Sequence, residues 1–167
     1  MAIPRDRHGL RPRDDEILFM KQKLVPLALL IMALAFVYLR FTAFRPRLHE
    51  LRVGSTTIRV DIADTIGKQR QGLSGRTSLS KDQGMYFPMG VLAIHRFWMK
   101  DMHFPLDIIW IRDGKIVEIS ENVPYPVGNQ LPVTVQPQAA ADAVLEVNAD
   151  FTENHRVKVG DTVQVAG

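Results

Sequence analysis

Apolar residues are distributed in two ways along the chain, and the difference divides it into an N-terminal segment and a domain. Residues 24–39 form an uninterrupted run of sixteen uncharged and mostly apolar residues. From residue 48 onward, the apolar runs are short and are separated by glycine, proline and Asp-Gly turns. In 57–62, apolar and polar residues alternate, and this period of two predicts a half-buried β-strand.

Two hairpins are expected in the domain. One joins 48–53 to 57–62 through Gly54-Ser55, and the other joins 106–111 to 116–121 through Asp113-Gly114, a pair that readily adopts positive φ angles. The remaining predicted elements are strands at 85–87, 91–100, 143–147 and 162–165, and short helices at 64–73, capped by Thr65, and at 151–155. This pattern predicts a mainly β (α+β) fold, a compact antiparallel β-sheet or barrel-like domain with one or two short helices.

The stretch from Phe97 to Ile111 is the expected core of this domain. It contains both tryptophans and reads as two buried strands joined by a polar bend. Pro88 is expected to end the strand before it, because proline cannot donate a hydrogen bond to a neighbouring strand. Residues 122–138 contain four prolines and are expected to form a long surface loop, where binding surfaces are common.

The N-terminal segment is predicted to anchor the chain in a membrane. The expected organisation is a lead-in at 1–23, a transmembrane helix at 24–44, a linker at 45–47 and the β-rich domain at 48–167. Sixteen helical residues rise about 24 Å, so spanning a hydrocarbon layer of roughly 30 Å requires the residues that follow Arg40 and a snorkelling arginine. A cleaved signal peptide, for which 33–35 has the small-x-small form, and a buried soluble helix are the alternatives.

The distribution of charge bears on orientation and on partners. Six Lys or Arg precede the apolar run and four follow it closely, which places the N-terminus in the cytoplasm. The prediction is therefore a single-pass protein of the cytoplasmic membrane with an extracytoplasmic C-terminal domain. That domain carries 12 basic and 14 acidic residues, a balance that predicts no nucleic-acid interface. The absence of cysteine excludes disulfides and thiolate chemistry.

Several short motifs in the domain resemble those of the family known as domain of unknown function 192. They are Arg70-Gln71-Gly72-Leu73-Ser74-Gly75-Arg76, Gly84-Met85-Tyr86-Phe87, Phe97-Trp98-Met99-Lys100, Pro105-Leu106-Asp107, Asp113-Gly114-Lys115-Ile116-Val117, Val144-Leu145-Glu146-Val147-Asn148-Ala149 and Gly160-Asp161. The resemblance covers roughly residues 50–165 and implies a compact, mostly β domain with short helices, often behind a signal peptide or anchor. It implies no activity. The chain departs from the family pattern at Ser74, Asp101, Met102 and Asp150.

Four charged residues within these motifs, Arg76, Lys100, Asp107 and Glu146, are the candidate ligand-binding residues. A charge inside a sheet needs a partner, so such residues form either structural ion pairs or a cleft. In the structural interpretation, the two cations neutralise the two acids. In the second interpretation, the cations bind an anionic or carbonyl group. A general acid/base pair of Asp107 and Glu146 is the third interpretation.

Methionine and histidine suggest a metal site as an alternative. Their thioether and imidazole groups suit Cu(I) where cysteine is absent, and the residues concerned are Met85, Met89, Met99, Met102, His95 and His103. Methionines beside aromatic residues are more often core filler, so we expect no metal and no other cofactor.

These observations predict a membrane-anchored extracytoplasmic binding or interaction module. Its expected partners are the membrane, through residues 24–44, and an envelope protein or a small anionic ligand. The sequence contains no nucleophile elbow, phosphate-binding glycine loop or His-Glu-x-x-His motif. The alternative is a small envelope enzyme, hydrolase-like, that uses Asp107 or Glu146.

Overall fold

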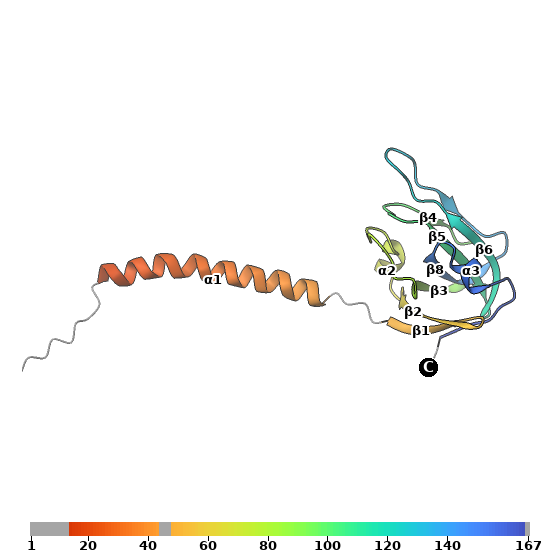
Figure 1. The fold of residues 1–167 in the computed structure, drawn as a ribbon, viewed down its shortest axis with the longest axis horizontal. Coiled ribbons are helices and arrows are strands. Elements are labelled where there is room, and N and C mark those ends of the chain that lie inside the picture. Colours follow the sequence, from red (N-terminus) through yellow and green to blue (C-terminus); the bar gives the residue numbers. More distant parts are fainter. Residues whose placement is uncertain (1–13, 44–47, 166–167) are drawn as a thin grey trace, which may run out of the picture. The chain divides into compact units, whose positions relative to one another are not determined.

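The computed structural model describes residues 14–43 and 48–165 (Figure 1). The chain divides into two compact units, Met1–Arg45 and Pro46–Gly167. The described part of the first unit is a single helix, α1 (Asp14–Ala43), which begins before the expected membrane segment. The expected linker 45–47 lies outside the described residues. Among the described residues, no helix combines the length and the hydropathy needed to cross a membrane.

The second unit is mainly β. Its strands are β1 (Leu48–Val53), β2 (Thr56–Ile62), β3 (Gln83–Ala93), β4 (Phe97–Trp98), β5 (Leu106–Arg112), β6 (Lys115–Val123), β7 (Thr134–Val135), β8 (Ala141–Asn148) and β9 (Val163–Val165). Seven of them form one sheet in the order β6-β5-β8-β3-β2-β1-β9, and β4 pairs with β7 in a small second sheet. All pairs are antiparallel except β2 with β3, whose crossover contains the helix α2 (Ile66–Gln71).

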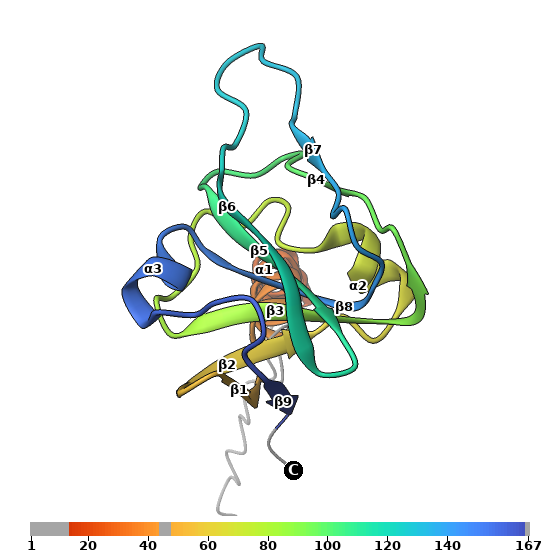
Figure 2. The ribbon, with the colours of Figure 1, turned by 90° about the vertical axis from the view of Figure 1, so that its right-hand side faces the viewer.

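The large sheet curls into a half-barrel (Figure 2). Its first and last strands approach each other at the β5–β6 turn, where Lys115 forms an isolated antiparallel bridge with Thr162. The Val163 amide donates to the Gly114 carbonyl over 2.8 Å, and the Ile116 amide donates to the Asp161 carbonyl over 2.9 Å. The curled sheet therefore has no open gap at this end of the β5–β6 hairpin.

Two hydrophobic clusters pack against the two faces of the sheet, and β8 contributes to both. Leu145 and Val147 belong to the cluster inside the curl, whereas Val144 packs in the other cluster with Phe87 and Trp110. Because side chains alternate along a strand, Glu146 shares the face of Val144. This second face carries the candidate site.

Most elements that depend on local pattern are confirmed. The β1–β2 and β5–β6 hairpins form as expected, Thr65 caps α2, and the second helix, α3 (Phe151–His155), has the predicted bounds. The connection between β6 and β7 is a long loop that projects from the sheet (Figure 2), as its prolines predicted.

The prediction for residues 85–100 was wrong in two respects. The strand β3 continues through Pro88, and the pairing register with β8 shifts between Pro88 and Ala93. A register irregularity accommodates a residue that cannot donate to the ladder. The chain then leaves the sheet, so 91–100 is not one strand and only Phe97 and Trp98 pair with β7.

Candidate functional site

A short helix and the loop after it build one wall of the site. The Thr65 side chain accepts a hydrogen bond from the Lys68 amide over 3.3 Å, and this cap starts α2 directly after β2. The helix ends at Gly72, whose φ of +51° lies in the left-handed region. Leu73 is buried behind it and fixes this turn on the second face of the sheet.

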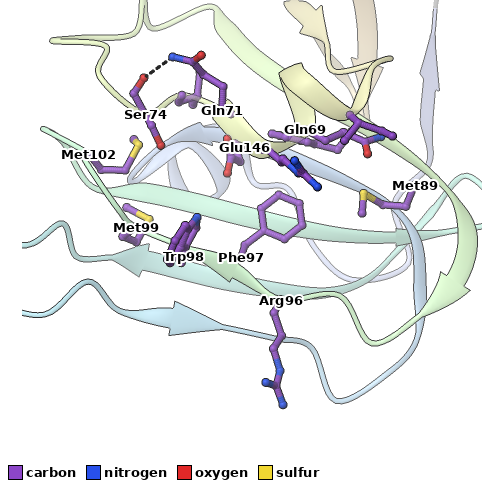
Figure 3. A pocket seen from close by; sticks show the side chains of 15 residues that line it. Gln69, Gln71, Ser74, Met89, Arg96, Phe97, Trp98, Met99, Met102 and Glu146 are labelled. Carbon is purple, nitrogen blue, oxygen red and sulfur yellow. Dashed lines mark hydrogen bonds between the residues drawn. The ribbon is translucent and has the colours of Figure 1, made fainter.

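Between this wall and the sheet lies a pocket of about 570 Å³ (Figure 3). Its lining comes from α2 and the following loop, from β3, from the β4 region and from β8. The lining residues are Ile66, Gln69, Arg70, Gln71, Gly72, Leu73, Ser74, Phe87, Met89, Arg96, Phe97, Trp98, Met99, Met102 and Glu146. Largely apolar walls with a few polar groups are typical of small-molecule sites.

Glu146 is the acidic residue of this lining, and it lies in apolar surroundings. Its neighbours across the sheet are Met85 on β3 and Ile108 on β5. The residue is 6% exposed, and its Oε2 has no hydrogen-bond partner among the described residues. Burial raises the pKa of the Glu146 carboxyl to about 8, and the charge of Arg76 opposes this only in part. Glu146 is therefore mostly protonated at neutral pH.

Gly72 packs close to this carboxyl without a side chain of its own. A Cβ added to Gly72 would lie 3.6 Å from Glu146 Oε2 and 3.6 Å from Phe87 Cζ. Phe87 meets Phe97 edge-on with 5.0 Å between ring centroids, and Phe97 meets Trp110 in the same way at 5.6 Å. Aromatic edges and faces thus form the apolar side of the pocket.

The polar side chains around the pocket are mostly engaged with the protein. Gln69 Nε2 donates to the Pro88 carbonyl over 3.3 Å, and Ser74 Oγ donates to the Lys100 carbonyl over 2.8 Å. Arg96 points away from the other labelled side chains in Figure 3, and its Nε donates to Gln136 Oε1 over 3.0 Å.

Asp107 is buried in a different environment. Its Oδ1 accepts from the Asn122 amide over 2.9 Å, and its Oδ2 accepts from the Thr152 amide over 2.9 Å and from Thr152 Oγ1 over 2.8 Å. These three bonds tie β5 to β6 and to the start of α3. Asp107 does not line the pocket. Among residues 14–43 and 48–165, its hydrogen-bond partners are Asn122 and Thr152, and no ion pair of Asp107 is found there.

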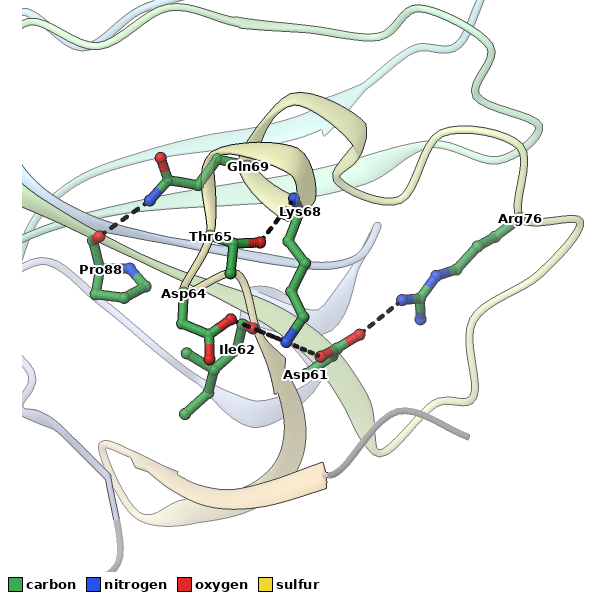
Figure 4. Close-up of polar contacts among 8 residues, drawn as sticks. All are labelled: Asp61, Ile62, Asp64, Thr65, Lys68, Gln69, Arg76 and Pro88. Carbon is green, nitrogen blue, oxygen red and sulfur yellow. Dashed lines mark hydrogen bonds and ion pairs between the residues drawn. The ribbon is translucent and has the colours of Figure 1, made fainter. Parts of the chain in front are cut away.

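The two candidate cations also have other partners than expected. Arg76 binds Asp61, with 3.0 Å between the guanidinium nitrogen and Oδ2, and Lys68 lies 3.7 Å from the other oxygen of Asp61 (Figure 4). Lys100 is exposed and lies over the Trp98 ring, 5.2 Å from its centroid. The predicted neutralisation of Asp107 and Glu146 by Arg76 and Lys100 was therefore wrong. Backbone amides can supply the hydrogen bonds that a buried carboxylate in a sheet needs. A sequence does not show which amides will lie next to it.

The methionines and histidines of the copper hypothesis lie in different parts of the domain. Met85, Met99 and Met102 are buried in the second hydrophobic cluster, and Met89 lines the pocket. His95 Nε2 lies 2.9 Å from the Val91 carbonyl oxygen. In the part of the chain that the structure describes, no group of three or more His, Cys, Asp or Glu side chains could hold a metal ion.

Of the four residues predicted from sequence, only Glu146 lines the pocket. Sequence reasoning missed the contributions of α2, Phe87 and Phe97. The Gly72-Leu73-Ser74 motif was the available signal, because a glycine directly after a predicted short helix often marks a left-handed turn.

The fold and the site therefore define a class of protein, a curled β-domain with a buried acid in a largely apolar pocket. The family model for domain of unknown function 192, described as Uncharacterized ACR, matches residues 49–165. The chain belongs to this family.

Two solved structures are similar to the chain. One is a protein of Sinorhizobium meliloti 1021, provisionally described as a transcription regulator, with 27% identity and a TM-score of 0.65; the match covers 72% of this chain and 95% of that one. The other is a protein of unknown function from Novosphingobium aromaticivorans DSM 12444, with 31% identity and a TM-score of 0.61, covering 70% and 84%. No curated protein matches the chain.

Proposed function

We propose that the protein is a membrane-anchored, extracytoplasmic binding module whose pocket holds a small ligand against Glu146. The observation that carries this proposal is the buried Glu146 Oε2 without a hydrogen-bond partner among the described residues. An unsatisfied buried oxygen costs about 1–3 kcal/mol. A ligand in the pocket that forms a hydrogen bond with this oxygen would remove that cost.

The size and chemistry of the pocket support a small-molecule ligand. Its volume of about 570 Å³ lies in the usual range for such sites. Phe87, Phe97 and Trp98 supply apolar surface, and Arg70 and Arg96 are the cations of the lining. This combination suits a ligand with an apolar body. The small anionic ligand expected from the sequence is still included in the proposal, because the lining contains these cations.

The membrane anchor is supported by the character of α1. From Leu24 to Leu39 the helix carries no charge, and its side chains are exposed in the structure. A helix that is apolar on all sides is usually buried in protein or in lipid. The basic residues that precede this segment favour a cytoplasmic N-terminus and an extracytoplasmic domain.

An envelope protein is the second partner that we propose, with the loop between β6 and β7 as its contact. Val127 is 60% exposed and Leu131 is 89% exposed on this loop. Photo-crosslinking from position 129, an exposed position of the same loop, should yield a discrete adduct in intact envelopes, and the double variant V127S/L131S should lose it. A crosslink that persists in the double variant would contradict this contact.

A hydrolase-like enzyme remains the alternative, and one observation favours it. The raised pKa of Glu146 would suit a general acid at neutral pH. Asp107 is a weaker candidate, because its oxygens accept three hydrogen bonds away from the pocket.

The pocket proposal can be tested with a small-molecule library and the full-length chain in detergent micelles. Compounds that raise the melting temperature should lose at least about tenfold in affinity in Trp98→Ala, which removes a 56% exposed wall of the pocket. Tyr125→Ala is the matched control, since Tyr125 is 37% exposed and does not line the pocket. Equal losses in both variants, or no binding compound at all, would refute the proposal.

The anchor can be tested separately by fractionation. The intact chain should sediment with membranes at high salt and alkaline pH and be released by detergent. Protease added to spheroplasts should digest residues 48–167 in cells with an intact membrane. Recovery of the intact chain in the soluble fraction would refute the anchor without affecting the pocket.

A further inference from the structure

The chemistry of the pocket narrows the ligand class, and the following inference rests on the proposed function. We infer that the pocket binds a carboxamide on an apolar body, with the amide paired to the Glu146 carboxyl by two hydrogen bonds. The acid O–H donates to the amide oxygen, and the amide N–H donates to the remaining carboxyl oxygen. This pairing satisfies both functions of a protonated carboxyl.

Glu146 presents a neutral carboxylic acid to the pocket. Oε2 is fully buried and lacks a partner among the described residues, and the carboxyl lies between Met85 and Ile108 across the sheet. The cation whose charge acts on this carboxyl, Arg76, forms its ion pair with Asp61. The carboxyl is therefore held as an acid, which offers one donor and one acceptor.

The charge of the pocket disfavours a cationic ligand. The charged residues of the lining are Arg70, Arg96 and Glu146, and of the two cations Arg96 points away from the other lining side chains. Arg76 adds a further positive field at the carboxyl. An ammonium group would meet a net positive site and would have to displace the proton of Glu146 before an ion pair could form.

A carboxylate is a poorer partner than a carboxamide for the Glu146 carboxyl. A carboxylate beside a protonated Glu146 can accept the acid O–H, but it has no donor for the other carboxyl oxygen and would lose hydration among Met85 and Ile108. Burying an unpaired charge is far more costly than burying a hydrogen-bonded neutral group. A neutral carboxamide avoids this cost and still supplies both partners.

The apolar part of the ligand would contact the aromatic wall of the pocket. Gly72 presents no side chain toward Glu146 Oε2 and the Phe87 ring, and an added Cβ would already be in van der Waals contact with both. Phe97 and Trp98 extend the apolar wall from there. A phenyl or branched aliphatic group on the amide suits this wall, because aromatic edges favour contact with aromatic and aliphatic groups.

Three probes with one carbon skeleton test the inference: 3-phenylpropanamide, 3-phenylpropanoate and 3-phenylpropylamine. Binding to the full-length chain in micelles is followed by NMR shifts of the Trp98 indole, with empty micelles as the control for partitioning. At about pH 6, the amide should bind at least about tenfold more tightly than the amine. Raising the pH to about 10 should weaken amide binding about tenfold, as the acid loses its proton.

Two variants at the same position sharpen the result. Glu146→Gln retains a donor and an acceptor, so amide binding should persist and lose its pH dependence. Glu146→Leu removes both and should weaken the amide about tenfold, whereas binding of propylbenzene, which makes no hydrogen bond, should not weaken. Thermal unfolding of each variant verifies that it is folded.

The opposite pattern would overturn the inference. If the amine binds best, binds more tightly as the pH rises and is lost in Glu146→Gln, the site is a cation site and the proposed binding function still stands. Tightest binding of the carboxylate would also overturn the carboxamide assignment. If neither the probes nor any library compound responds to Trp98→Ala, the proposed function fails as well.

Discussion

Gly72 lies directly over the carboxyl of Glu146, so that a Cβ on Gly72 would come within 3.6 Å of Glu146 Oε2. One residue closes a short helix and the other comes from the middle of the sheet, 74 positions later in the chain. Their contact is the point at which α2 and β8 enclose the pocket. Substitutions at either residue should therefore alter stability and binding in separable ways.

Gly72→Ala should destabilise the fold by about 1–2 kcal/mol, because an L residue is strained at a φ of +51°. It should also weaken ligand binding, because the new methyl group narrows the space beside Phe87. Gly75→Ala is the matched control: its φ is +78°, and nothing lies within 4 Å of an added Cβ. Urea denaturation should give similar losses for both, with weaker binding for Gly72→Ala alone.

Stability should fall as the pH rises from about 4.5 to about 8, because the folded state keeps the Glu146 proton that the unfolded chain has lost. At about 1.4 kcal/mol for each pH unit between the two pKa values, the upper bound on this loss is about 5 kcal/mol. Glu146→Gln should flatten the profile in this range. Parallel profiles for wild type and variant, measured by denaturation at each pH, would rule out a protonated Glu146.

Asp107→Asn should cost about 2–4 kcal/mol, because an amide group cannot accept all three hydrogen bonds that the carboxylate accepts from Asn122 and Thr152. Ligand binding by the remaining folded protein should be unchanged. Asp142→Asn is the control, since Asp142 accepts one exposed bond from the Asp113 amide and should cost less than about 1 kcal/mol. Loss of binding without loss of stability in Asp107→Asn would place Asp107 in the site after all.

Arg76→Met should destabilise the domain by about 2 kcal/mol, because among the described residues it leaves the buried Asp61 with the more distant Lys68 as its cation. It should also raise the pKa of Glu146 further, since the Arg76 charge lowers it. Arg59→Met is the matched control: its pair with Asp82 is more than half exposed on both sides and should contribute at most about 1 kcal/mol. Equal effects of the two substitutions, measured by denaturation, would contradict the structural role of Arg76.

Sequence pattern was sufficient where an element is defined by its own residues. The Asp113-Gly114 turn and the alternation of 57–62 predicted their hairpins, and 151–155 predicted α3 with correct bounds. The long β6–β7 loop followed from its prolines. In each case the determining interactions span only a few positions.

The pocket and its charge partners could not be obtained in this way. The orientation of Glu146 depends on β8 lying between β3 and β5, and the satisfaction of Asp107 depends on amides from β6 and α3. Pro88 misled the strand prediction because a register shift with β8 accommodates it. These relationships join residues far apart in the chain, which local pattern does not encode.

The position of β9 constrains when the domain can fold. This last strand pairs with β1, the first, and Val163 also bonds to the β5–β6 turn. During synthesis, the edge of β1 therefore stays open until residue 165 has left the ribosome. Contacts of such long sequence separation form slowly, so the domain should reach its native state only after β9 has emerged, and a variant that lacks β9 should expose the β1 edge to pairing with other chains.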